Sequence, residues 1–244
     1  MKNIITLIFT ISLIWSQSAN EIIKKAEKLV KGTSSVATFK MTVATPDFKR
    51  TMEMDSWWEG NKNALIVIKS PRREKGNKTL KIGNEMWSYL RRTETTIKIP
   101  PSMMLQSWNG SDFTNDDLVR ESNLAKDYVQ KLIGKEKFRN TNCWKIELTP
   151  KPEAPVVWGK LIYWVRIKGY IPMQVDYYNE KNELVRSLIY SNIKNFDGRN
   201  IPAKMKMINH KKKNHSTIIE YLKLKFNAKI PKRIFSFQEL ERGN

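Results

Sequence analysis

The sequence predicts a mainly β protein with a few helices, built as an open antiparallel half-barrel around a helical lid. Apolar and polar residues alternate along about twelve short runs, which is the pattern of half-buried strands. Turn residues separate most consecutive runs, as expected for hairpins. Two further apolar segments do not fit the strand pattern and remain available to cover the sheet. Sequential antiparallel strands with one apolar face tend to curl into a barrel or a half-barrel.

A targeting signal is predicted at the N-terminus. Lys2 provides the positive charge, residues 4–15 form an apolar stretch, and small residues suited to cleavage follow at Ser16, Ser18 and Ala19. The apolar stretch is shorter than the roughly 20 residues of a membrane-spanning helix. We therefore expect residues 1–19 to be a cleaved signal peptide and residues 20–244 to form a single domain. A retained anchor is the alternative.

Charge and cysteine content narrow the possible partners. The formal net charge of +20 favours anionic partners, namely lipid head groups, acidic protein surfaces or nucleic acid. Export argues against nucleic acid, and a soluble protein with scattered charge is the alternative. Cys143 is the only cysteine, which excludes an intramolecular disulfide. Its setting in an alternating run predicts a buried strand residue.

A single amphipathic helix is predicted directly after the signal, over residues 20–31. Its apolar residues share one stripe and its charged residues lie opposite. Asn20 is suited to cap its start and Gly32 to end it. The helix must bury its stripe against another element, so it is one of the two candidate lids.

The strands are expected at residues 38–43, 51–58, 64–68, 79–82, 85–90, 95–99, 143–148, 160–167, 173–177, 183–193, 203–209 and 216–226. The strongest hairpin turn has Asp197-Gly198 at its centre. The third run, 64–68, is apolar on both sides, which indicates that something covers its outer face. A last helical turn is expected within residues 235–242.

The segment after Ile99 is the second candidate lid. Two prolines end the preceding strand, because proline cannot donate to a β-ladder. An apolar cluster follows at Met103, Met104, Leu105 and Trp108. Thr114 and Asp117 then have the spacing of a capping box at a helix start. We interpret this segment as an apolar plug laid across the sheet, and a helical core connection is the alternative.

Signals for enzyme chemistry are weak. His210 and His215 flank three lysines that would repel a metal ion, and Asp116-Asp117 is explained by helix-start electrostatics. No HExxH, GxSxG, P-loop or dinucleotide fingerprint occurs. We therefore expect no catalysis, no metal and no cofactor. Methionines are more informative, because their flexible side chains suit surfaces that accept variable apolar shapes, although they also fill ordinary cores.

The central part of the chain, about residues 50–128, resembles the LolA-like outer-membrane lipoprotein-sorting proteins. The resemblance rests on a set of short motifs in a fixed order: Lys69-Ser70-Pro71, Gly76, Met86-Trp87, Tyr89-Leu90, Pro100, Met103-Met104, Gly110-Ser111-Asp112-Phe113 and Asp117-Leu118. A weaker match follows at Asp197-Gly198-Arg199 and Ile201-Pro202.

The resemblance implies a periplasmic, non-enzymatic carrier that holds the acyl chains of a lipid or lipoprotein in an apolar cavity and moves them towards the outer membrane. It also implies a lid-locking arginine, for which Arg50, Arg91 and Arg92 are candidates by charge. An ABC-type or RND-type transporter is the expected partner, and the carrier is expected to be a monomer. An envelope sensor or scaffold of the same fold, which binds a membrane protein, is the alternative. The residues expected to contact acyl chains are Met41, Val43, Met52, Met54, Trp58, Trp87, Tyr89, Met103, Met104, Trp108, Phe113 and Leu118.

Overall fold

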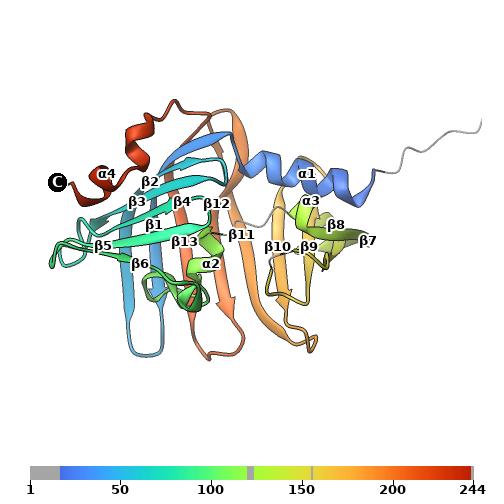
Figure 1. The fold of residues 1–244 in the computed structure, drawn as a ribbon. Helices are drawn as coiled ribbons and strands as arrows, with labels where there is room; N and C mark the ends of the chain where they lie inside the picture. The colour runs from blue at the N-terminus through green and yellow to red at the C-terminus, as the bar shows by residue number, and fades with distance from the viewer. Residues whose placement is uncertain (1–16, 120–123, 155, 243–244) are drawn as a thin grey trace, which may run out of the picture.

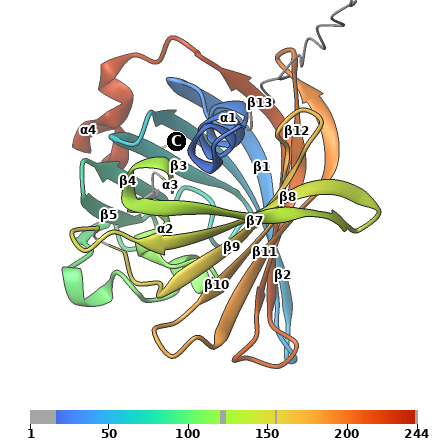
Figure 2. The ribbon, with the colours of Figure 1, turned by 90° about the vertical axis from the view of Figure 1, so that its right-hand side faces the viewer.

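A computed structural model describes residues 17–119, 124–154 and 156–242. Within them, one 13-stranded antiparallel sheet has the order β6-β5-β4-β3-β2-β1-β13-β12-β11-β10-β9-β8-β7 (Figure 1). The sheet is open, and Figure 2 shows it curving around the helix α1 (Ala19–Val30). The predicted open half-barrel is therefore confirmed. Most of the predicted signal peptide, residues 1–16, lies outside the described residues.

The first half of the sheet consists of β1 (Ser34–Ala44), β2 (Lys49–Glu59), β3 (Asn63–Ser70), β4 (Lys78–Ile82), β5 (Glu85–Leu90) and β6 (Thr95–Lys98). The second half consists of β7 (Tyr128–Phe138), β8 (Thr141–Pro150), β9 (Lys160–Arg166), β10 (Pro172–Tyr178), β11 (Leu184–Phe196), β12 (Arg199–Asn209) and β13 (Ser216–Phe226). The expected turn at Asp197-Gly198 is confirmed, since both residues have positive φ, 52° and 80°.

The strand missing from the sequence prediction is β7. It lies at one edge of the sheet, where Val129 and Ile133 stay exposed and lysines occupy much of the remaining surface. An edge strand has no second neighbour, so its pattern is weaker than the alternation of a central strand. The other edge is β6, which precedes β7 in the chain. The connection between the two edge strands therefore carries the second lid.

The first lid is α1 (Ala19–Val30), which covers the inner face of the second half of the sheet. Its buried stripe packs against core residues of β7 to β10, among them Tyr128, Trp144 and Tyr163. The N-cap is Ser18, which forms a complete capping box with Glu21, so the expected cap at Asn20 is wrong. Asn20 instead donates to Gln130 Oε1 at 2.9 Å, because it already lies in the first turn and faces β7.

The C-terminal segment covers the outer face of β3 to β5. It comprises η3 (Lys232–Phe235) and α4 (Phe237–Glu241), which confirms the expected last helical turn. Leu240 is fully buried against Leu65 and Leu80. The buried Lys78 donates from Nζ to the main-chain carbonyls of Glu239 at 2.8 Å and Arg242 at 2.7 Å. This cover is why the third predicted strand is apolar on both sides.

Replacing Leu240 with alanine tests this contact. Loss of a fully buried leucine creates a cavity, so we expect Leu240→Ala to lower the free energy of unfolding by about 2–4 kcal/mol. Urea unfolding followed by circular dichroism measures the change. The exposed neighbour Gln238→Ala is the control and should change stability by less than ~0.5 kcal/mol. Equal effects of the two variants would contradict the burial of the C-terminal segment.

Candidate functional site

The second lid, which we call the central lid, comprises residues 100–119. It contains η1 (Pro101–Met103), η2 (Trp108–Gly110) and α2 (Asn115–Val119), and it lies on the inner face of β1 to β5. The predicted capping box is confirmed, since Asp117 N–H donates to Thr114 Oγ1 at 3.1 Å and Thr114 N–H donates to Asp117 Oδ2 at 2.8 Å. A short helix α3 (Leu124–Asp127) leads on to β7.

Only half of the expected apolar plug faces the sheet. Trp108 and Met104 are buried, whereas Met103 is 37% and Leu105 is 59% exposed. The tight turns of the 3₁₀ segment direct neighbouring side chains to different sides, so these four residues cannot all face inward. The buried pair packs on two different parts of the sheet: Trp108 on the methionine-rich core of β1 to β3, and Met104 on Met86 of β5.

Polar contacts fix the central lid to the strands beneath it. Trp108 Nε1 donates to Thr79 Oγ1 at 3.2 Å, and Asp112 N–H donates to Thr217 Oγ1 at 2.8 Å. Arg50, one of the three predicted lid-locking arginines, donates to the main-chain carbonyl of Asn109 and pairs with Glu74 at 2.9 Å. The second candidate, Arg91, instead pairs with the exposed Glu94. Of these two candidates, Arg50 is therefore the one that the structure brings to the lid.

A second arginine holds the lid from the opposite side of the half-barrel. Arg186 of β11 forms a bidentate pair with Asp117 of α2, at 2.8 Å and 2.5 Å. Its side chain is 6% exposed and its guanidinium lies over the rings of Trp158 and Tyr177. Burial opposes the charge, but the adjacent Asp117 carboxylate outweighs it and raises the pKa of Arg186. Arg186 therefore stays charged, and its bidentate bond to Asp117 connects α2 to the far half of the sheet.

The sequence analysis did not single out Arg186. Arg186 occupies an inward position of β11, and the next inward positions of that strand are Leu188 and Tyr190. An arginine in such a stripe of apolar and aromatic residues is the signal by which the sequence could have identified it. Its partner, Asp117, was interpreted only as a helix cap.

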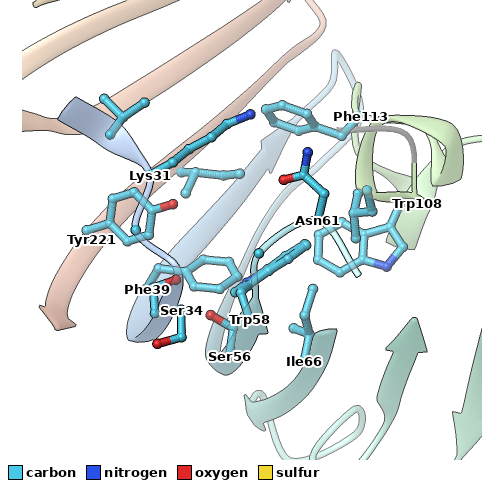
Figure 3. A pocket seen from close by; sticks show the side chains of 16 residues that line it. Lys31, Ser34, Phe39, Ser56, Trp58, Asn61, Ile66, Trp108, Phe113 and Tyr221 are labelled. Carbon is cyan, nitrogen blue, oxygen red and sulfur yellow. The ribbon is translucent and has the colours of Figure 1, made fainter. Parts of the chain in front are cut away.

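The first cavity lies between the central lid and the first half of the sheet and has a volume of about 190 Å³. Figure 3 shows side chains of β1, β2, β13 and the lid converging on it. Its apolar wall includes Phe39, Trp58, Ile66, Trp108, Phe113, Leu118, Ile219 and Tyr221. Polar side chains of Ser34, Ser56 and Asn61 complete the lining.

The second cavity adjoins the first and has a volume of about 300 Å³. It lies between α1, α2 and the second half of the sheet, and its wall includes Tyr163, Val175, Tyr177, Leu188, Tyr190, Met205 and Met207. Val30, Lys31, Phe113, Leu118 and Tyr221 line both cavities, so these residues form the wall between them. The Lys31 side chain extends towards Phe113 (Figure 3).

Three charged residues that line the second cavity, Glu27, Lys31 and Asp117, belong to ion pairs. Asp117 pairs with Arg186, and Glu27 accepts from the main chain of Leu124 at 2.9 Å and pairs with Lys31 at 3.8 Å. Burial raises the pKa of Tyr177 to about 12, so this phenol is neutral at physiological pH. The cavity wall therefore has a largely apolar or neutral surface, and the ion pairs connect its parts.

The structure brings some of the predicted acyl-contact residues together and separates others. Trp58, Trp108, Phe113 and Leu118 line the first cavity. Met41, Val43, Met52 and Met54 are buried in the core beneath Trp108, and Met104 packs beside that core on Met86. Trp87 and Tyr89 lie on the outer face under the C-terminal segment, because their positions on β5 alternate with that of the inward Met86. Of the lining of the second cavity, the sequence analysis predicted only Phe113 and Leu118, and it missed the rest, including Met205 and Met207.

Comparison with solved structures identifies the class of fold. A DUF1329 family protein from Desulfovibrio piger superposes with a TM-score of 0.81 at 22% identity, covering 91% of this chain and 97% of that one. A putative outer membrane lipoprotein-sorting protein domain from Vibrio parahaemolyticus gives 0.79 at 22% identity, over 92% and 98%. A LolA superfamily protein from Nitrosomonas europaea gives 0.75 at 22% identity, over 92% and 100%. The chain has the LolA-like fold, as the sequence resemblance predicted.

The family model described as "Uncharacterized protein" matches residues 60–242, and the chain belongs to that family. A comparison with curated proteins finds no match. In the described part of the chain, no helix has both the length and the apolar character that crossing a membrane requires.

The Arg186–Asp117 pair gives a direct test of lid attachment. Asp117→Asn leaves a buried guanidinium without its counter-charge, so we expect the free energy of local opening of α2 to fall by about 3 kcal/mol. Hydrogen–deuterium exchange of residues 115–119 should become faster, while exchange in the central strands stays slow. In the double variant Arg186→Met/Asp117→Leu no unpaired charge remains, and protection should partly return. Equal exchange in wild type and Asp117→Asn would show that the pair does not hold the lid.

Proposed function

We propose that this protein is a carrier that binds the acyl chains of a lipid or lipoprotein in the two adjoining cavities. The observation that carries the proposal is the hollow between the sheet and its two lids, whose wall is mostly apolar and aromatic. Water forms few hydrogen bonds with such a wall, whereas each CH₂ group transferred from water into the cavity is stabilised by about 0.8 kcal/mol. The volume of about 300 Å³ for the second cavity is within the range of ligand pockets, ~300–1,000 Å³.

Loading and release require the central lid to move. Its polar contacts with the sheet divide into two groups: Arg50, Thr79 and Thr217 hold it on one side, and Arg186 holds it on the other. Breaking the Arg186–Asp117 pair would free α2 and with it Leu118, which lines both cavities. We infer that the two cavities join when this end of the lid opens, and that the joined space accepts longer chains.

The proposed setting is the periplasm, after removal of the N-terminal signal. The contacts of Gln17 and Ser18 indicate which cleavage positions would leave α1 intact. Ser18 caps α1, and Gln17 Nε2 donates to Tyr170 Oη at 2.7 Å. Cleavage before Gln17 preserves both contacts, whereas cleavage after Ala19 removes them. Delivery by way of an ABC-type or RND-type transporter, with the carrier as a monomer, remains part of the proposal.

Lipid extraction tests the carrier. Protein purified without detergent is expected to release acyl lipid that mass spectrometry detects. In Ser56→Leu, the added apolar group occupies the first cavity and displaces two or three CH₂ groups of the bound chain. We expect about a 30-fold loss of affinity for a fluorescent fatty-acyl probe, because about 2 kcal/mol of burial is lost.

The matched control is Ser191→Leu, the same change at an exposed position of β11. It should bind the probe like the wild type. Protein that neither carries lipid nor takes up the probe would contradict the carrier. A stoichiometric complex with a membrane protein, formed without lipid, would instead support the sensor or scaffold of the same fold.

A further inference from the structure

Two turns form a protruding surface at the end of the sheet far from the C-terminus of α1. They are the β1–β2 turn, residues 45–48, and the β12–β13 loop, residues 210–215. They leave the sheet from neighbouring positions, since Ala44 pairs with both Lys49 and Ser216. Figures 1 and 2 both place the two turns side by side at the bottom of the molecule. We call residues 45–49 and 210–215 the tip surface.

The tip surface is basic. Lys49, Lys211, Lys212 and Lys213 are exposed on it, and Asp47 is its one acidic side chain. Lys211 pairs with Glu183 of a neighbouring turn at 3.5 Å, but both side chains are more than half exposed. An ion pair this exposed contributes little to stability, and another anion can readily replace Glu183 as the partner of Lys211. The lysines of the tip therefore remain available to an anionic partner.

The tip surface also presents an aromatic ring to solvent. Phe48 is 51% exposed, although phenylalanine is usually among the more buried residues. Main-chain and side-chain bonds of Thr45 close the turn and direct it outward: Thr45 N–H donates to the Phe48 carbonyl at 2.9 Å, and Phe48 N–H donates to Thr45 Oγ1 at 3.2 Å. A ring held in this way on a tight turn can enter an apolar layer without unfolding the turn.

We propose that the tip surface docks the protein on the surface of a bilayer that contains anionic lipids. Lysines near such a surface are attracted to the head groups, and an aromatic side chain beside them inserts at the boundary with the acyl chains. The lysines suit the layer of anionic head groups, and the protruding ring beside them suits the boundary with the acyl chains. A second copy of the chain is a poor partner, because two lysine-bearing tips repel one another.

Docking at this end places the bilayer beside one of the lid attachments. Arg50 follows Phe48 and Lys49 directly on β2, and it donates to the Asn109 carbonyl of the central lid. Thr217, which bonds Asp112 of the lid, follows the β12–β13 loop on β13. A docked protein therefore has the attached side of its lid close to the lipid surface. The proposal concerns the surface alone and does not depend on the proposed cargo.

Vesicle co-sedimentation tests docking by the tip surface, and it compares removal of lysines from the tip with removal of the same charge elsewhere. The probes are vesicles of phosphatidylcholine alone and of phosphatidylcholine with phosphatidylglycerol. The variant Lys211→Gln/Lys212→Gln/Lys213→Gln is compared with Lys62→Gln/Lys225→Gln/Lys229→Gln, which removes the same charge from exposed positions at the opposite end. We expect binding to the anionic vesicles to fall at least ~10-fold in the tip variant and less than ~3-fold in the control.

Equal losses in the two triple variants would overturn the proposal, because they would show that net charge alone attracts the protein. Equal binding of the wild type to both kinds of vesicle would overturn it as well. Retention of the wild type on an acidic protein surface, together with no vesicle binding, would assign the tip to a protein partner instead. Circular dichroism spectra of the variants establish that each is folded.

A fluorescent label measures the insertion itself. Cys143 is fully buried, and burial raises the pKa of its thiol, so a thiol-reactive dye should modify an introduced surface cysteine selectively. The emission of an environment-sensitive dye on Phe48→Cys should shift to the blue with anionic vesicles. The same dye on Leu222→Cys, at an exposed position of β13 away from the tip, should not respond. Equal shifts at both positions would contradict docking by the tip.

Discussion

The structure depends on a topological constraint: the two free edges of the sheet, β6 and β7, are consecutive strands. Strands β1 and β13 pair at the centre, so the sheet grows outward from the two ends of the chain and its edges come from the middle. The segment that joins the edges bears the central lid on the concave face. An open sheet exposes an apolar concave face to water, and this connection covers one half of it while α1 covers the other.

Two covers that approach from different sides leave space where they meet. The central lid packs on β1 to β5 and α1 packs on β7 to β10, and the adjoining cavities lie between these two packed regions. The Arg186–Asp117 pair spans this junction and sets how far α2 lies from the second half of the sheet. A buried ion pair is directional, so it fixes the position of the lid more narrowly than apolar contacts alone. The cavities and the Arg186–Asp117 pair thus both lie where the two lids meet.

The two faces of the sheet have different roles. The inner face carries the lids and the cavities, while the outer face of β3 to β5 is sealed by the C-terminal segment through Leu240 and Lys78. Basic side chains lie on many turns and exposed strand positions, and at the tip four exposed lysines lie beside Phe48. The part of the molecule that would meet a membrane is therefore separate from the cavity wall, although Arg50 links the tip to the lid.

The sequence by itself determined the class of fold, twelve of the strands, the capping box of Thr114 and Asp117, and four of the residues that line the first cavity. These features are local, because alternation, turn residues and caps depend on neighbours within a few positions. Only the tertiary structure decided which apolar residues face a cavity and which fill a core or the outer face, as the separation of Trp58 from Trp87 illustrates. It also decided the partner of Asp117, since Arg186 is distant in the chain and a strand carries no local signal for what lies across the half-barrel. The cavity is a property of how two lids meet, and that meeting depends on contacts between residues far apart in the sequence.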